Sequence, residues 1–258
     1  MDKNFRDVIT AAMKEAGGIL REKFDSFERS SVTLKSAHEI ITENDLLSEK
    51  IIVEAIKKNF PEHAILSEEE GSVHNDSDYR WIIDPIDGTT NFSIHNPIWA
   101  ISVALAHKNE IILGVVYAPI LDELFIAEEG NGASKNGLKI AVSKIDSGKV
   151  INTFCHGNNM TDIKRGIAYY SKAKLNSVDC RQLGSASLEL AYVSSGRVES
   201  LVIPGVNAWD VAGGVLLVRE AGGRVTDFHG DEWTFESHDI IASNGLVHQR
   251  LLNELKEI

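Results

Sequence analysis

The run Trp81-Ile82-Ile83-Asp84-Pro85-Ile86-Asp87-Gly88-Thr89-Thr90-Asn91-Phe92 carries the strongest structural signal in the chain. Its apolar start predicts a buried strand over 81–84 that delivers Asp84 to its end. Because proline cannot donate a ladder hydrogen bond, we expect Pro85 to end that strand. Asp87 follows three residues later, in a turn that Gly88 permits. The run therefore predicts two acids presented together at a strand end.

This strand end has the chemistry of a cation site. Asp84, Asp87 and the carbonyl of Ile86 offer oxygen ligands within one turn, which suits hard divalent cations. Zinc would favour His or Cys, and neither is placed here. Thr89 and Thr90 open the next segment, where free backbone N–H groups can receive an anion. The alternative interpretation is that both aspartates only form turns and cap backbone amides.

Three more segments bring acids to the ends of predicted elements. Ile65-Leu66-Ser67-Glu68-Glu69-Glu70-Gly71 ends a strand, although an acidic run can also be a solvated loop. Asn207-Ala208-Trp209-Asp210-Val211-Ala212-Gly213-Gly214 opens a helix, where Asp210 could simply stabilise the helix start. The two glycines that close this segment predict close packing of the helix. In Thr42-Glu43-Asn44-Asp45, Asp45 could be an ordinary residue of a first helical turn.

Composition and charge exclude several classes of protein. A chain of 258 residues can bury a real core. Its formal net charge of -12 argues against direct nucleic-acid binding, which needs clustered Lys and Arg, and against adsorption to anionic membranes. Cys155 and Cys180 form no metal or disulfide pattern. The charged start Met1-Asp2-Lys3-Asn4-Phe5 is unlike a signal peptide, and no apolar run approaches ~20 residues. We expect a soluble cytoplasmic protein.

Periodicity predicts alternating helices and strands. Helical spacing marks an opening helix from Phe5 to Leu20 and a second helix from about Asp45 until Pro61 ends it. Asn136-Gly137 predicts a hairpin turn. Further helices are expected at 163–173, from Ser185, near Trp209 and around Leu246–Leu255, and strands at 64–67, 81–84, 101–106, 111–118, 124–127, 150–154, 178–183, 200–203 and 240–242. This order predicts an α/β protein of stacked layers.

In this order, the 81–92 run, the Glu68-Glu69 strand end and the 209–214 run resemble the inositol monophosphatase family. The resemblance extends from Lys35 and 42–45 to Glu220-Ala221-Gly222-Gly223. It implies an αβαβα five-layer sandwich of the sugar phosphatase type. It also implies one domain over 1–258, with two lobes of about 1–145 and 146–258, and a homodimer.

The resemblance also implies a role for each site residue. Glu69 would orient a water, and Asp45 with Thr89 would position and activate the attacking water. The metal ligands would be Glu68, Asp84, the Ile86 carbonyl, Asp87 and Asp210. The substrate contacts would be Gly88, Thr89, Arg181, Gly184, Ser185, Ala186 and Asp210. Gly184-Ser185 can alternatively be read as a helix start with Ser185 as its cap.

The implied activity is hydrolysis of a small phosphomonoester with two or three Mg²⁺ ions per site and no covalent phosphoenzyme. Inositol 1-phosphate is the first expected substrate. Ile203 stands where animal inositol phosphatases carry a glutamate that contacts an inositol hydroxyl, so strict inositol specificity is not expected. Fructose 1,6-bisphosphate, histidinol phosphate and the 2′-phosphate of NADP are the alternative substrates. A regulatory binding protein that keeps the fold is the alternative from another class.

Overall fold

A computed structural model describes residues 5–73 and 77–256 of the chain. Met1–Asn4, part of the charged start discussed above, lie outside the described residues. Among the helices that are described, none has the length and apolar character needed to cross a membrane.

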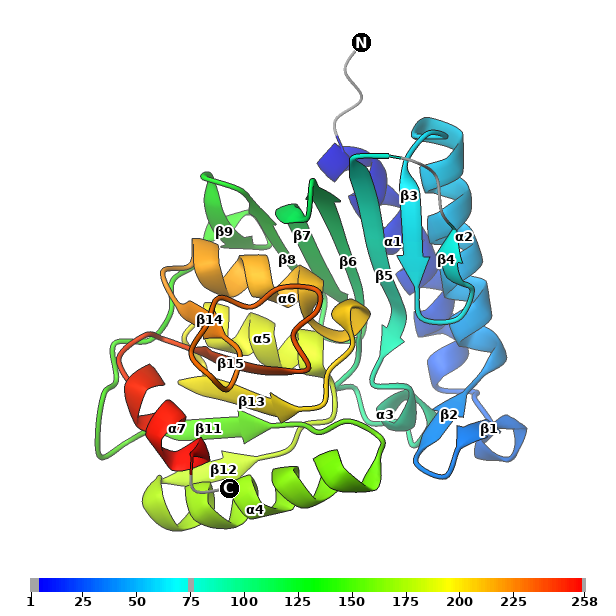
Figure 1. Ribbon diagram of the computed structural model, residues 1–258. Helices are drawn as coiled ribbons and strands as arrows, with labels where there is room; N and C mark the ends of the chain where they lie inside the picture. Colours follow the sequence, from blue (N-terminus) through cyan, green and yellow to red (C-terminus); the bar gives the residue numbers. More distant parts are fainter. Residues whose placement is uncertain (1–4, 74–76, 257–258) are drawn as a thin grey trace.

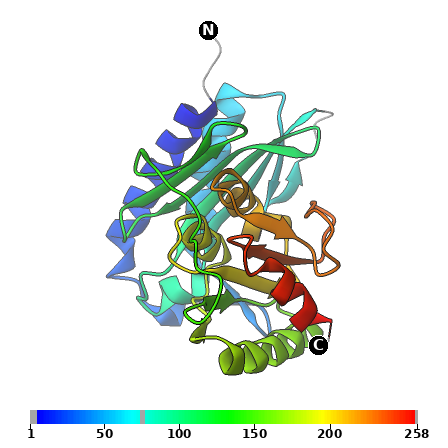
Figure 2. The same ribbon diagram turned by 90° about the vertical axis from the view of Figure 1, so that its left-hand side faces the viewer.

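The elements stack in five layers, as the resemblance implies (Figure 1). Helices α1 (Phe5–Phe24) and α2 (Glu43–Asn59) cover an eight-stranded sheet of order β10-β9-β8-β7-β6-β5-β3-β4. Helices α5 (Ala186–Ser194) and α6 (Ala208–Glu220) form the middle layer. A five-stranded sheet of order β12-β11-β13-β15-β14 follows, and α4 (Met160–Asn176) and α7 (His248–Leu255) cover its far side, as Figure 2 shows from a second direction.

The strands agree closely with the predicted ones. In the first sheet they are β3 (Ala64–Ser67), β4 (Gly71–Val73), β5 (Tyr79–Asp87), β6 (Ala100–His107), β7 (Glu110–Ala118), β8 (Glu123–Glu128), β9 (Gly132–Lys135) and β10 (Leu138–Lys139). In the second sheet they are β11 (Ile151–Phe154), β12 (Asp179–Arg181), β13 (Ser200–Pro204), β14 (Arg224–Thr226) and β15 (Asp239–Ser243). The predicted hairpin at Asn136-Gly137 is confirmed, because both residues have positive φ and join β9 to β10.

Alternation along the strands divides the core into three parts. Trp81 and Ile83 face α1 and α2, whereas Ile82 between them faces the middle helices. In the second sheet Leu201 faces the middle layer and Val202 faces α4 and α7. Both sheets are therefore buried on both faces, and the middle helices pack on both of them.

Several short elements were not predicted from the sequence. They are the exposed hairpin of β1 (Thr33–Ser36) and β2 (Glu39–Ile41), the 3-10 turn Arg29–Ser31, β4, β14 and the short helix α3 (Thr89–Ser93). No residue of the two strands is fully buried, since the four β1 residues are exposed and the three β2 residues are half-buried. A pattern of buried residues could not reveal it.

The prediction that Pro85 ends its strand is wrong. β5 continues to Asp87, and its pairing with β6 shifts between Asp84 and Asp87, where β5 carries one extra residue. Such a bulge accommodates proline because the extra residue does not need a ladder hydrogen bond. The hydroxyl of Ser48 on α2 donates to the Pro85 carbonyl at 2.9 Å and fixes the bulge from outside the sheet.

The predicted close packing of the glycine-containing helix is confirmed. A Cβ added to Gly114 on β7 would lie 2.4 Å from the Gly213 carbonyl oxygen on α6. One added to Gly214 would lie 2.4 Å from Cβ of Leu190 on α5. The absence of side chains at these positions lets α6, which carries Asp210, approach the first sheet at backbone distance.

We predict that Gly114→Ala lowers the free energy of unfolding by roughly 1–3 kcal/mol, because the added methyl forces α6 away from β7. Gly18→Ala is the matched control, since Gly18 lies exposed on α1 with open space around it. That control should gain about 0.5–1 kcal/mol from the better helix propensity of alanine. Urea unfolding measures both variants, and equal stability of the two would contradict the backbone contact.

Candidate active site

The bulge at the end of β5 presents its two acids in different ways. Asp84 is buried, and its Oδ1 accepts the N–H of Ile86 at 3.1 Å. Asp87 accepts four donors, from the hydroxyls of Ser185 (2.7 Å) and Ser187 (2.5 Å) and from the N–H groups of Ala186 (3.0 Å) and Ser187 (2.6 Å). Ser185 therefore lies at the start of α5 but makes no side-chain cap hydrogen bond there. Its hydroxyl binds Asp87 instead.

Asp45 is both a helix-capping residue and the partner of Thr89. The N–H and hydroxyl of Thr42 donate to Asp45 Oδ2 at 2.9 and 2.6 Å, which completes a capping box at the start of α2. The Thr89 hydroxyl contacts Asp45 Oδ1 at 2.9 Å and the Ile86 carbonyl at 3.0 Å. Asp45 is therefore a helix-start residue, and its other oxygen contacts the residue with which it was predicted to act.

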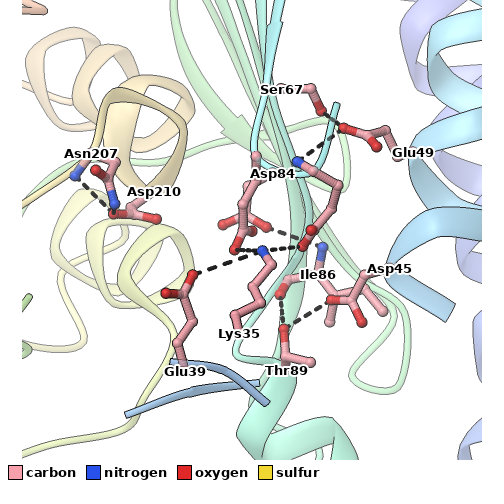
Figure 3. A network of polar contacts seen from close by, with 12 residues as sticks. Lys35, Glu39, Asp45, Glu49, Ser67, Asp84, Ile86, Thr89, Asn207 and Asp210 are labelled. Carbon is pink, nitrogen blue, oxygen red and sulfur yellow. Dashed lines mark hydrogen bonds and ion pairs between the residues drawn. The ribbon is translucent and has the colours of Figure 1, made fainter. Parts of the chain in front are cut away.

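Glu68 and Glu69 face a lysine that the sequence analysis assigned no role. The Lys35 ammonium, on the β1–β2 hairpin, lies 3.1 Å from Glu68 Oε1, 2.6 Å from Glu69 Oε1 and 3.7 Å from Glu39 Oε1 (Figure 3). Behind this turn the buried Glu49 accepts the Ser67 hydroxyl and the N–H groups of Glu69 (3.3 Å) and Glu70 (3.2 Å). The acidic run is therefore a fixed turn and not a solvated loop.

Asp210 also belongs to a helix start. It is the third residue of α6, and its Oδ2 accepts the N–H of Asn207 at 2.9 Å. The helix-start interpretation of Asp210 is therefore confirmed. Figure 3 shows Asp210 approaching from the side opposite to Asp45 and Thr89, across Lys35 and Asp84.

One cavity of about 340 Å³ joins these segments. Residues from β2, β5, α3, α5, β13 and α6, and from the loops beside them, line it, so segments from both halves of the chain meet there. The predicted site residues in its wall are Glu68, Asp84, Ile86, Asp87, Gly88, Thr89, Gly184, Ala186 and Asp210. Gly88 has φ +98, and an added Cβ would lie 3.0 Å from the Gly184 carbonyl, so only glycine suits this position.

Four predicted residues lie outside the cavity wall. Asp45 lies behind Thr89, and Glu69 faces Lys35. Ser185 is buried against Asp87. Arg181, predicted to contact substrate, is exposed and forms an ion pair with Asp179. The structure does not bring Arg181 together with the acids.

The carboxylates of the cavity raise one another's pKa. Burial, followed by the charges of Glu68, Asp87 and Asp210, raises the pKa of Asp84 well above its usual range. Burial raises the pKa of Glu68 to about 8 despite Lys35, and burial raises that of Asp210 to about 7 despite its bond from Asn207. Such a cluster favours cations, since each ion would cancel part of this repulsion.

Lys35 is the cation that Glu68 and Glu69 meet in this structure. Burial lowers the pKa of Lys35, but the two carboxylates outweigh burial and raise it overall. In residues 5–73 and 77–256, no three acid, His or Cys side chains stand close enough around one point to hold an ion as they are placed. The donor set of carboxylates and one carbonyl nevertheless suits Mg²⁺, provided that Glu68 exchanges its lysine partner for the ion.

Several residues that hold this site had no role predicted from the sequence. They are Lys35, Glu39, Glu49, Asn91, Ser187 and Glu189. A usable signal was present for two of them. Glu49 lies on the stripe that continues through Ile52 and Ile56, and Glu189 interrupts an apolar helix, so both acids had to be buried.

The chain matches one protein family along its whole length. A model of the Inositol monophosphatase family matches residues 1–258. The chain is 37% identical over 253 residues to a Nus factor SuhB of Pasteurella multocida and 36% identical over 263 residues to an inositol-1-monophosphatase of Mesorhizobium japonicum. Each match covers 97% of this chain and 95% of the relative. The solved extragenic suppressor protein suhB of Bartonella henselae superposes with a TM-score of 0.92, at 34% identity and 98% coverage of both chains.

The layered fold is thus that of the inositol monophosphatases. Because the family model matches the whole length, the chain belongs to the inositol monophosphatase family.

We predict that Lys35→Met lowers the melting temperature by roughly 3–8 °C in the absence of divalent cations, because Glu68 and Glu69 lose their counter-charge. Added Mg²⁺ should then raise the melting temperature more than it does in the unmodified chain. Lys135→Met is the control, since Lys135 pairs with Glu123 at a similar 3.1 Å but outside the cavity. Scanning calorimetry with and without Mg²⁺ tests this, and an unchanged Mg²⁺ response in Lys35→Met would contradict it.

Proposed function

We propose that the chain is a Mg²⁺-dependent phosphatase of small phosphomonoesters, with inositol 1-phosphate as its first substrate. The observation that carries the proposal is the meeting of Glu68, Asp84, Asp87 and Asp210 at one cavity, beside the Thr89–Asp45 pair. A phosphate dianion cannot approach such a cluster unaided. One like-charge pair at ~4 Å costs about 4 kcal/mol at an effective dielectric near 20.

The metal ligands would be Glu68, Asp84, the Ile86 carbonyl, Asp87 and Asp210. Two or three bound Mg²⁺ ions would supply positive charge for the phosphate oxygens, activation of a water and stabilisation of the leaving alkoxide. The chain's own part is to hold the acids in place. Asp87 is held by Ser185, Ala186 and Ser187, and Asp210 by Asn207.

Thr89 and Asp45 would position and activate the attacking water. The Thr89 hydroxyl, which lines the cavity, donates to Asp45 Oδ1 and leaves its oxygen able to accept a hydrogen bond from water. Burial raises the pKa of Asp45, which makes it a better proton acceptor than an exposed aspartate. Glu69 would orient a water. The backbone N–H groups of Gly88 and Thr89 would donate hydrogen bonds to the phosphate.

We predict that Asp84→Asn lowers kcat at least about a hundredfold while the circular dichroism spectrum stays unchanged, because a central ligand is lost and repulsion is relieved. The Mg²⁺-dependent rise in melting temperature should shrink as well. At one hundred times its dissociation constant, one ion adds about 2.7 kcal/mol to the stability of the unmodified chain. Asp122→Asn, on an exposed turn outside the cavity, is the control and should change neither quantity. Near-normal turnover in Asp84→Asn would mean that the ligands are misassigned.

The alcohol part of the substrate would lie against Gly184, Ala186 and Ile203, which line the same cavity. Ile203 is almost fully buried and apolar, so it cannot accept a hydrogen bond from a ring hydroxyl. This favours a tolerant site, and fructose 1,6-bisphosphate, the 2′-phosphate of NADP and histidinol phosphate stay as candidate substrates.

We predict that Ile203→Glu raises the preference for inositol 1-phosphate over glycerol 2-phosphate about tenfold in kcat/KM, because the carboxylate can accept a ring hydroxyl. Ile203→Leu is the matched control and should leave the ratio unchanged. Steady-state phosphate release with saturating Mg²⁺ measures both variants. An unchanged ratio in Ile203→Glu would remove residue 203 from substrate recognition.

A second candidate is a regulatory binding protein that keeps the fold, and the name Nus factor carried by relatives such as the Pasteurella multocida protein favours it. Phosphate release from a panel of sugar phosphates, with and without Mg²⁺, separates the two. Release that needs Mg²⁺ supports the enzyme, and none from any substrate supports the binding protein. A homodimeric assembly and a cytoplasmic location stay predictions.

A further inference from the structure

Glu189 is a buried acid outside the predicted ligands and catalytic residues. It lies near the start of α5, among the apolar residues Leu188 and Leu190, and its side chain is fully buried. A carboxylate in such a place is costly unless donors reach its oxygens. Its contacts therefore indicate what it does in the fold.

One oxygen of Glu189 collects three donors. Oε1 accepts the N–H groups of Leu183 and Gly184, each at 3.0 Å, and the thiol of Cys155 at 3.1 Å. The other oxygen, Oε2, is buried and has no hydrogen-bond partner among the described residues. Burial raises the pKa of Glu189 to about 7, although the Cys155 thiol, the Thr153 hydroxyl and the two loop amides lower it. The side chain is thus placed for the loop amides and not for an ion pair.

The same two residues are also held through their carbonyls. Asn91 on α3 donates from Nδ2 to the carbonyls of Leu183 (2.7 Å) and Gly184 (3.3 Å). Gly184 has φ +84, and an added Cβ would lie 3.1 Å from the same Nδ2. Both N–H groups and both carbonyls of this dipeptide are therefore bonded, the former to Glu189 and the latter to Asn91.

The residues that follow this dipeptide hold a predicted metal ligand. Ser185, Ala186 and Ser187 supply all four hydrogen bonds to Asp87, and Gly184 and Ala186 form part of the cavity wall. A displacement of 183–184 would move these donors, and the orientation of Asp87 would change with them.

We propose that Glu189 is a positioning residue of this site: its carboxylate holds the 183–187 segment, and through it Asp87, in the geometry that turnover requires. Glu189 acts through Asp87 and the cavity wall and does not touch the substrate. The effect of Glu189 on turnover rests on the proposed phosphatase function, whereas its stabilisation of the 183–187 segment does not.

Steady-state kinetics test the effect of Glu189 on turnover with three variants and a control. Glu189→Ala removes the acceptor, Glu189→Asp keeps the charge but withdraws it from the amides, and Glu189→Gln keeps both length and acceptor. We expect Glu189→Ala and Glu189→Asp to lower kcat about tenfold or more with a smaller change in KM, and Glu189→Gln to recover most of kcat.

Glu199→Ala is the matched control. Glu199 is equally buried and holds the Ser143 hydroxyl and the Ile151 N–H, each at 2.7 Å, but it lies outside the cavity wall. It should lose stability and keep its kcat. If Glu199→Ala loses as much kcat as Glu189→Ala at equal melting temperature, or if Glu189→Asp turns over normally, the positioning role is overturned.

Amide hydrogen exchange followed by mass spectrometry tests whether Glu189 holds the 183–187 segment, and this measurement does not depend on catalytic activity. Peptides that cover 183–187 should exchange at least about tenfold faster in Glu189→Asp than in the unmodified chain or in Glu199→Ala, and nearly normally in Glu189→Gln. Unchanged protection in Glu189→Asp overturns the proposal whatever the activity. If the unmodified chain releases no phosphate, the proposed function is wrong. The exchange rates of residues 183–187 then still show whether Glu189 holds this segment in place.

Discussion

Four carboxylates, those of Glu68, Asp84, Asp87 and Asp210, face one cavity, and their mutual repulsion has to be offset for the chain to fold as it does. The offset is uneven. Among the described residues, Asp87 receives four hydrogen bonds and Glu68 a lysine ammonium, whereas Asp84 receives one backbone N–H. The deficit of positive charge is therefore greatest at the centre of the cluster, where the bulge of β5 places Asp84. This unevenness is what makes a cation site a better interpretation than a structural polar core.

Buried acids that lie outside the cavity wall fix the loops that form it. Glu49 on α2 binds the N–H groups of Glu69 and Glu70, and Glu189 on α5 binds those of Leu183 and Gly184. In each case a helix in the core holds two successive amides of a loop at the cavity. The cavity wall is thus built of loops, but the positions of these loops are set by helices that pack in the core, which is how a loop site can be as well defined as one on regular elements.

The stacked layers could be predicted, because strand and helix periods extend over enough residues to be recognised. The acids of the candidate site were assigned by the resemblance of three motifs to a known family. The bulge at Pro85 could not be predicted, since proline at a bulge and proline at a strand end look alike in sequence. The role of Lys35 could not be predicted for a different reason. Lys35 lies on a short hairpin with no fully buried residue, and only the folded chain brings it to Glu68. Arg181 shows the opposite failure, because the motif that contained it was recognisable while its side chain pairs with Asp179.

The capping boxes of α2 and α6 have a consequence for how the site comes together. Asp45 and Asp210 are each oriented by a residue three positions earlier, through contacts that exist as soon as the helix forms. These two acids can therefore take their direction from contacts within their own helix starts. Asp84 and Asp87 cannot, because the bulge that presents them exists only when β5 pairs with β6.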